Sequence, residues 1–474
     1  MTAAPLTFHR RARNALDNAN LQEALDVSTG RMTAARRQAF AELAGGDAIR
    51  DHARQIRAHT IAHLATYLDQ FVERAQAAGA TVTFAATADD ARRYVLALAQ
   101  THDVQRIVKS KSMVTEEIDL NTSLEAAGLR VIETDLGEYV VQLDHDHPSH
   151  IIAPIIHKTR RDVAATFRRE LNASDADVAD IPAMTAFARR QLRAEFLAAD
   201  MGISGVNFAV AETGSICLCT NEGNGRLTTS APRLHVAMMG LERIVPTTPD
   251  LGVVLQVLAR SATGQPLTVY TNLITGPRQP DDPDGPSDLH IVIVDNGRSR
   301  MLRTELEEIL YCIRCGACLN ACPVYQEIGG HTYASVYPGP VGSVFTPGAF
   351  GREAWSDLPQ ASSLCGACKE VCPVRIDIPR MLLALRADSI AAGEGPFWVR
   401  AGLRAFSAVA TRPWVFRLLG RFGRLALGLL AKGGRIEALP GPLAGWTRYR
   451  TFPMMAPETF TARWRRTHRP EGRA

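Results

Sequence analysis

The chain has 474 residues, and its hydrophobic fraction of 46% and charged fraction of 22% are typical of a water-soluble protein with two or three domains. The sequence has no run of 18 or more uncharged apolar residues, and the basic residues 1–20 are followed by no apolar core, so neither a membrane-spanning helix nor a secretory signal is expected. We therefore expect a cytoplasmic location. The net charge of +4 is uneven, because residues 393–474 contain 15 Lys/Arg and only 4 Asp/Glu.

The first two thirds of the chain predict a helical segment followed by an α/β domain. Residues 1–65 are expected to be helical, since stretches 15–25 and 32–43 repeat apolar residues at spacings of three and four. Residues 66–298 alternate helical and strand patterns, which predicts βαβ units and a mainly parallel sheet. Predicted strands are 81–84, 106–108, 130–133, 206–210, 215–218, 234–238, 267–271 and 289–294, with helices at 67–78, 89–101, 114–127, 183–201 and 252–261 and a loop at 276–287.

Three residues of this domain are candidates for binding or catalysis. Lys109 and Lys111 follow a predicted parallel strand, and open α/β sheets bind ligands at that end. With Glu212, they would provide a cation for a carboxylate and an acid or base for a hydroxyl group. The alternatives are a solvated strand end for the lysines and an ordinary β-turn at 212–215 for the glutamate.

Two further groups of residues are of interest as metal ligands. The stretch 144–157 holds a dense set of histidines and aspartates, but Pro148 and Pro154 interrupt any regular face, so loop histidines are favoured over a metal site. Cys217 and Cys219 alternate along a predicted strand and are interpreted as small buried hydrophobic residues. The members of the histidine-rich stretch are Asp144, Asp146, His145, His147, His150 and His157.

Residues 299–392 contain the most specific motif of the chain. A predicted helix at 303–310 leads to a C-x2-C-x2-C-x3-C-P run, the spacing by which bacterial ferredoxins bind a cubane iron–sulfur cluster. Small residues Gly316 and Ala317 keep the loop tight, and the proline turns the chain away from it. The run consists of Cys312, Cys315, Cys318, Cys322 and Pro323.

A second, incomplete motif follows at Cys365, Cys368, Cys372 and Pro373. Ser362 stands where a fourth cysteine would complete it. Because the last cysteine of such a run binds the other cluster, cluster one is assigned Cys312, Cys315, Cys318 and Cys372, and cluster two Cys322, Cys365 and Cys368. Cluster two is therefore either [3Fe–4S], or [4Fe–4S] with its last iron held by a serine oxygen, water or a substrate atom.

Zinc and disulfides are the alternatives for these seven cysteines. Zinc sites use four ligands in CxxC pairs, and disulfides are rare in cytoplasmic proteins, so iron is strongly favoured. We therefore expect a helical ferredoxin-like module with two iron–sulfur clusters, closed by a helix at 380–392.

The basic region 393–474 is predicted to be helical and amphipathic. Aromatic residues alternate there with arginines, which favours docking on an acidic partner over a peripheral contact with an anionic membrane, and no nucleic-acid-binding motif accompanies the charge. The residues concerned are Trp398, Phe406, Trp414, Phe416 and Phe422, with Arg400, Arg404, Arg412, Arg417, Arg421 and Arg424.

Nearly the whole chain resembles the family of lactate utilization iron–sulfur proteins, which are components of a three-part lactate oxidation system. The resemblance is carried by the two cysteine motifs and by stretches 108–117, 133–139, 148–151, 211–215 and 362–365. It implies an α/β domain similar to the sugar-isomerase and CoA-transferase folds, partner proteins, and the oxidation of L-lactate to pyruvate. The absence of a cysteine at position 362 is shared by that family.

Two other functions stay open from the sequence. One is an electron carrier for a heterodisulfide or glycerol phosphate system, with the α/β domain as an adaptor. The other is a transferase or isomerase with structural clusters and Glu212 as catalyst. The sequence shows neither a GxGxxG fingerprint after a strand nor a Walker loop, so hydride chemistry is expected to need another subunit.

Overall fold

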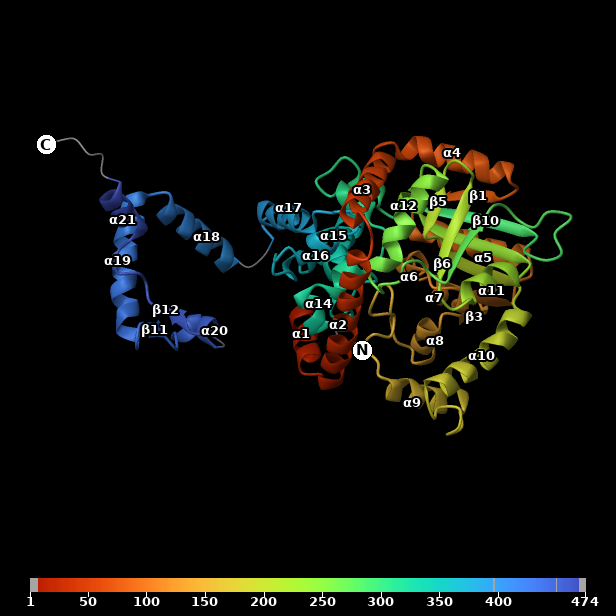
Figure 1. Ribbon diagram of the computed structural model, residues 1–474, viewed down its shortest axis with the longest axis horizontal. Coiled ribbons are helices and arrows are strands. Elements are labelled where there is room, and N and C mark those ends of the chain that lie inside the picture. Colours follow the sequence, from red (N-terminus) through yellow and green to blue (C-terminus); the bar gives the residue numbers. More distant parts are fainter. Residues whose placement is uncertain (1–6, 395–396, 449, 469–474) are drawn as a thin grey trace. The chain divides into compact units, whose positions relative to one another are not determined.

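The structure, a computed structural model, describes residues 7–394, 397–448 and 450–468. The chain divides into two compact units, Met1–Ala391 and Ala392–Ala474 (Figure 1). Residues 1–6 of the predicted N-terminal segment, and residues 395–396, 449 and 469–474 of the predicted basic region, lie outside the described residues.

The first unit is built on a six-stranded sheet in which every neighbouring pair of strands is parallel. Its order is β1-β10-β7-β4-β2-β3, so the mainly parallel α/β fold predicted from the sequence is confirmed. The central strands are almost entirely apolar because helices cover both faces of a parallel sheet. The strands are β1 (Thr81–Ala85), β2 (Arg106–Lys109), β3 (Arg130–Glu133), β4 (Met201–Gly205), β7 (Leu234–Gly240) and β10 (Asp288–Val294).

The helices around this sheet begin at clear capping signals. Thr87 and Asp90 form a capping box at the start of α5, and Thr247 and Asp250 form another at the start of α12. The single helix predicted at 114–127 is divided in two, because Asp119 takes a left-handed backbone conformation with φ of +50°. The helices are α4 (Leu64–Ala77), α5 (Ala88–Thr101), α6 (Met113–Glu117), α7 (Leu120–Ala126), α8 (Leu136–Leu143), α9 (Arg160–Leu171), α10 (Ile181–Ala198), α11 (Asn224–Ser230) and α12 (Thr248–Leu258).

A second sheet of four strands, ordered β8-β5-β6-β9, is a layer that the sequence pattern does not predict. Its pairs are antiparallel except for β5 with β8. The strands are β5 (Phe208–Val210), β6 (Ser215–Thr220), β8 (Ile244–Val245) and β9 (Tyr270–Ile274).

Strand β4 of the large sheet is also absent from the sequence-based prediction. The helix predicted at 183–201 ends at Ala198, and residues 201–205 become a strand because the parallel neighbours β2 and β7 supply its hydrogen bonds. Local propensity could not reveal this strand, since its partners come from residues far away in the chain.

The N-terminal helices lie between the sheet domain and the cysteine region. They are α1 (Phe8–Leu16), α2 (Ala19–Ala41) and α3 (Gly46–Ala62). Helix α2 packs on the cysteine-region helices α13 and α14, and α3 packs on α12, as Figure 1 shows. The buried guanidinium of Arg57 donates to the carbonyl oxygens of Leu310 (3.0 Å) and Glu242, and so connects both regions to α3.

The cysteine region is a set of short helices that shares one hydrophobic core with the sheet domain. The prediction of an α-helix at 303–310 is wrong, because Arg303 has φ of +60° and only a 3-10 turn forms after it. The elements include the 3-10 helices η4 (Glu307–Tyr311) and η5 (His331–Tyr333) and the α-helices α13 (Ala317–Asn320), α14 (Pro323–Ile328), α15 (Gly339–Phe350), α16 (Ala367–Val371) and α17 (Ile378–Ala391).

The second unit is mainly helical. It contains α18 (Phe397–Ala410), α19 (Pro413–Leu430), α20 (Ala444–Thr447) and α21 (Phe460–Thr467) and a small hairpin of β11 (Arg435–Ile436) and β12 (Phe452–Pro453). Large apolar side chains are exposed along α18 and α19, including Trp398, Phe406, Trp414 and Phe422. Within the described ranges, the chain contains no helix with the length and apolarity required to cross a membrane.

Candidate iron-sulfur centre and the adjoining cavity

The structure brings cysteines from both motifs to one place. Cys312, Cys315, Cys318 and Cys372 all line one small cavity. The intervening residues 319–371 fold back through α14, α15 and α16 and return Cys372 to the first motif. These four residues are the ligand set that the cross-over rule predicts for one cubane cluster.

The walls of this cavity are mostly apolar, and Cys315 and Cys372 are buried there, whereas Cys312 and Cys318 are half-buried. Burial, together with the neighbouring thiols, raises the pKa of Cys315 to about 12, and burial raises that of Cys372 to about 11. Four crowded thiols cannot all ionise in such a place without a cation between them, and thiolate-bound iron supplies that charge. The residues therefore fit an iron–sulfur cluster. Beside the four cysteines, the cavity is lined by Ile151, Ile313, Arg314, Gly316, Val341, Pro373, Val374, Ile376 and Ile378.

The loop of the first motif depends on a glycine in the left-handed region. Gly316 has φ of +81° and precedes α13, and a Cβ atom there would come within 3.1 Å of His150 and of Ile152. The backbone N–H of Arg314 donates to Cys312 Sγ at 3.3 Å. Such N–H···S bonds to ligand sulfur atoms are one of the means by which a protein sets a cluster's reduction potential.

Basic side chains surround the first set of cysteines. Arg50 donates to the carbonyl oxygen of Cys372 at 2.8 Å, and Arg36 donates to that of Val371 at 2.8 Å. Burial, and then the neighbouring Arg50, lower the pKa of Arg36. These cations come from α2 and α3, and they would balance the negative charge of a thiolate-bound cluster.

A buried ion-pair network connects this region to the large sheet. Arg298 donates to both carboxylate oxygens of Glu117 (2.8 and 2.6 Å) and to Glu242 (2.8 Å). Glu242 also accepts from Arg314 at 3.4 Å. Burial alone would raise the pKa of Glu242, but Arg298, Arg243 and Arg314 outweigh it and lower the pKa to about 2. Nothing in the sequence signals this network, since its members are scattered from residue 117 to residue 314.

The second set of cysteines lies closer to the surface. Cys322 and Cys368 are buried, whereas Cys365 is exposed. Burial raises the pKa of Cys368 to about 12, with the thiols of Cys322 and Cys365 as further contributors. A hydrogen bond from the backbone of Ala367, and another from the side chain of Ser363, lower the pKa of Cys365. The three cysteines therefore lie close enough to influence one another, and they remain the prediction for cluster two.

A larger cavity of about 260 Å³ adjoins the first set of cysteines. It lies at the carboxyl ends of the parallel strands, where α/β sheets bind their ligands, and Arg314 and Cys315 form part of its wall. Burial, and then the nearby Asp135, raise the pKa of Glu222, so this carboxyl group is suited to hold a proton. The other charged lining residues are Lys111, Asp135 and Arg243.

Of the three substrate-site candidates from the sequence, the structure places only Lys111 on this cavity. Lys109 is completely buried, and its Nζ contacts Glu133 (2.7 Å), Glu116 (3.0 Å) and Thr115 (3.0 Å). Its amine is engaged in this interior network and does not face the cavity.

Glu212 does not join the two lysines either. It is exposed, and its carboxylate accepts from the backbone N–H of Thr248 (3.0 Å) in the first turn of α12. A helix N-terminus favours a carboxylate, so this glutamate acts as a cap. Sequence reasoning missed Glu222 and Arg243, because nothing in their local pattern marks them as neighbours of the cysteine loop.

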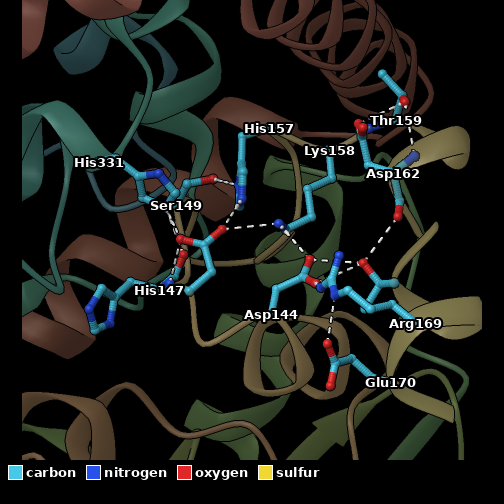
Figure 2. A network of polar contacts seen from close by, with 12 residues as sticks. Asp144, His147, Ser149, His157, Lys158, Thr159, Asp162, Arg169, Glu170 and His331 are labelled. Carbon is cyan, nitrogen blue, oxygen red and sulfur yellow. Dashed lines mark hydrogen bonds and ion pairs between the residues drawn. The ribbon is translucent and has the colours of Figure 1, made fainter. Parts of the chain in front are cut away.

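The histidine-rich stretch connects the sheet domain to the cysteine region. His157 bonds to Asp146 (2.9 Å) and to Ser149 (2.7 Å), and Asp146 also contacts Lys158 at 3.1 Å. His331 of the cysteine region bonds to the carbonyl oxygen of His147 at 2.6 Å, as Figure 2 shows. The network thus joins the loop 144–158 to η5.

Asp146, His157 and His331 also place three possible ligand atoms within 4.8 Å of one another. Lys158 already supplies a cation to this carboxylate, so a hydrogen-bonded network is favoured over a metal site. His150 is buried at the first cysteine loop, where its Nε2 bonds to Asn320 (3.1 Å). Burial, and then Lys111, lower the pKa of His150 to about 3, so its ring is neutral.

Cys217 and Cys219 lie on β6 with their sulfur atoms 4.0 Å apart. Cys217 belongs to the hydrophobic core, as the strand pattern predicts, whereas Cys219 is half-buried and lines the large cavity.

In comparison with known proteins, three family models match successive parts of the chain from residue 68 onwards. A LUD domain model matches residues 68–294, a 4Fe-4S dicluster domain matches residues 308–376, and a model of the C-terminal region of lactate utilisation protein B matches residues 394–469. The chain therefore contains a 4Fe–4S dicluster domain, and the two cysteine motifs fit iron–sulfur binding.

Similar proteins extend over almost the full length. Lactate utilization protein B of Shouchella clausii is 44% identical over 98% of both chains, and the uncharacterized electron transport protein YkgF of Escherichia coli is 42% identical over 98% of this chain and 97% of that one. A solved structure of a DUF162 family protein from Deinococcus radiodurans covers 49% of this chain and 98% of its own, with 15% identity and a TM-score of 0.28. On the strength of the full-length relatives, the chain belongs to the lactate utilization protein B family.

Proposed function

We propose that this chain is the iron–sulfur electron-transfer component of a system that oxidises L-lactate to pyruvate. The observation that carries the proposal is the meeting of Cys312, Cys315, Cys318 and Cys372, from two distant motifs, around one apolar cavity. Thiolate-bound clusters exchange single electrons, and the oxidation of one lactate releases two electrons and two protons. Two clusters in one chain could together accept the two electrons from one lactate.

We assign the cysteines to two clusters by the cross-over rule. Cys312, Cys315, Cys318 and Cys372 would hold a [4Fe–4S] cluster, and Cys322, Cys365 and Cys368 would hold a second one. The mostly apolar wall around the first set limits the access of water, and two arginines of α2 and α3 supply compensating charge. The protein would thereby protect the first cluster and leave the second open on the side of Cys365.

The cavity beside Cys315 is the proposed binding place for a small carboxylate such as lactate. Lys111 and Arg243 supply positive charge there, and Glu222 supplies a carboxyl group with a raised pKa. Lys111 Nζ donates to the carbonyl oxygen of Ile152 at 2.9 Å, and this hydrogen bond holds the ammonium group in place. A carboxylate held in this cavity would lie next to a ligand residue of the first cluster.

The oxidation itself is assigned to a partner protein. The relatives are named for lactate utilization and electron transport, and the resemblance implies a three-component system in the cytoplasm. We infer that the basic second unit, with its exposed aromatic side chains, docks on an acidic partner and that the electrons continue to a respiratory acceptor such as a quinone.

The test is anaerobic purification of the full chain with its co-purifying partners, followed by paramagnetic resonance with and without L-lactate. The expected result is a brown protein that contains iron and sulfide, with cluster signals that appear on addition of L-lactate. Matched samples with D-lactate and glycerol phosphate serve as controls for the substrate. A colourless protein with zinc in place of iron, or clusters that glycerol phosphate reduces and lactate does not, would contradict the proposal.

A further inference from the structure

The two cysteine loops share a sequence and the left-handed backbone conformation of two matched residues. Both contain the sequence Cys-Gly-Ala-Cys, at 315–318 and at 365–368. The residue before this sequence has positive φ in both loops, +58° for Arg314 and +55° for Leu364. The glycines agree as well, with +81° for Gly316 and +86° for Gly366, and a short helix follows each. The second loop is therefore a structural copy of the first.

The copy extends to the position where the second motif lacks its cysteine. In the first loop the backbone N–H of Arg314 donates to Cys312 Sγ at 3.3 Å. In the second loop the backbone N–H of Leu364 donates to Ser362 Oγ at 3.1 Å. Ser362 Oγ thus receives the same hydrogen bond, from the same loop position, as a cluster-ligand sulfur. At this one position the two loops differ by a single atom, oxygen in place of sulfur.

Hydrogen bonds from Arg386 hold the backbone of Ser362 in this position, and the alignment of the two motifs distinguishes Ser362 from Ser363. Arg386 donates to the carbonyl oxygen of Ser362 at 2.9 Å and to that of Pro359 at 2.8 Å, which fixes the peptide that carries the hydroxyl. Ser363 stands one position later, where the first motif has Ile313, which is not a ligand. Of the two adjacent serines, Ser362 is the one that occupies the place of the missing ligand.

We propose that Ser362 Oγ is the fourth ligand of the second cluster, beside Cys322, Cys365 and Cys368, so that this cluster is [4Fe–4S]. The inference rests on the proposed function, because it requires that these three cysteines hold iron. Ligation forms an Fe–O bond and breaks the O–H bond, and the proton leaves to solvent at the exposed side of Cys365. The N–H of Leu364 stabilises the resulting alkoxide.

An oxygen ligand has a measurable consequence for the cluster. Alkoxide is a harder donor than thiolate and favours the more oxidised iron. The second cluster is therefore expected to have a lower reduction potential than the same cluster in the Ser362→Cys protein, where all four ligands are sulfur.

The experiment compares the full-length, anaerobically prepared protein with Ser362→Ala, Ser362→Cys and the control Ser363→Ala. Iron and sulfide content, Mössbauer spectra and paramagnetic resonance before and after oxidation are recorded for each. Ser362→Ala is expected to lose about one iron per chain and to show an oxidised three-iron signal. Ser362→Cys is expected to retain the four-iron cluster with a raised potential, and Ser363→Ala to retain its full iron content.

The first cluster is the internal reference in every sample, since its ligands are unchanged. If Ser362→Ala keeps a four-iron second cluster with the wild-type spectrum and potential, the serine is not a ligand and only this inference fails. A three-iron second cluster in the anaerobic wild-type protein would overturn it equally. Iron-free wild-type protein would instead contradict the proposed function as a whole, so the two failures are distinguishable.

Discussion

The two sets of cysteines share one loop design but occupy different environments. The first set lines an apolar cavity with arginines from α2 and α3 around it, whereas the second set includes the exposed Cys365. Solvent access and local charge are the main means by which a protein tunes a cluster. Under the proposed assignment, the first set holds an inner centre next to the large cavity, and the second set holds an outer centre on the side of the exposed Cys365.

The largest expected effect is the loss of the inner centre in Cys318→Ala. This change removes one of its four ligand atoms, while the sheet domain keeps its own core and stays folded. Iron content is expected to fall by about half, and lactate-dependent reduction of the acceptor to be lost. Iron analysis and reduction assays with the partner proteins measure both. Undiminished lactate-dependent reduction would show that electrons do not use this centre.

Next in size is the effect of removing the cation that joins the inner centre to the sheet. Arg298→Met leaves the buried carboxylates of Glu117 and Glu242 without their main partner, which is expected to cost about 3–5 kcal/mol of unfolding free energy. Denaturant unfolding followed by far-ultraviolet circular dichroism measures the loss. Arg169→Met is the control, because the Arg169 side chain is 58% exposed and its ion pair with Asp144 is expected to contribute less than about 1 kcal/mol.

The same network predicts a dependence of stability on pH. The pKa of Glu242 is lowered from 4.5 to about 2 in the folded chain. At pH values above 4.5, the pKa of the unfolded chain, the ionised carboxylate therefore stabilises the fold in full. This contribution, about 3 kcal/mol from the size of the shift, is lost as the pH falls from 4.5 through 2. Unfolding free energies of wild type and Glu242→Gln should therefore converge over this range. A difference that stays constant from about pH 6 to about pH 2 would exclude ionisation of Glu242 as its cause.

The smallest expected effect is a difference between the two centres in the rate at which a chelator removes their iron. A water-soluble iron chelator is expected to remove iron from the outer centre about tenfold faster than from the inner one, because Cys365 is exposed and the first set is enclosed. The decay of the separate paramagnetic signals with time measures the two rates. Equal rates would show that the loop 362–368 does not expose its cluster.

The fold class and the two cysteine motifs could be predicted from the sequence because both depend on local patterns. Strands such as β10 are short apolar runs between turn residues, and the cysteine spacing sets the geometry of a single loop. The secondary-structure predictions failed where contacts with distant segments or a turn of the chain determine the local structure. Residues 201–205 form a strand because β2 and β7 flank them, and 303–310 do not form an α-helix because the chain turns at Arg303.

The candidate site shows the same division. Lys111 lies on the cavity, as its position after a strand predicts. The sequence predicts the same for Lys109, but Glu133 and Glu116 enclose its amine in the interior. No local pattern could reveal that Glu222 lines a cavity with Cys315, because the two residues meet only through the fold.

By itself, therefore, the sequence determined which residues are suited to bind iron, since iron selects thiolates at fixed short spacings along the chain. Only the tertiary structure decided which environment each set of cysteines occupies and which polar residues meet them. Burial and charge compensation arise from contacts between segments hundreds of residues apart, such as Arg50 with Cys372, and those contacts exist only once the chain has folded.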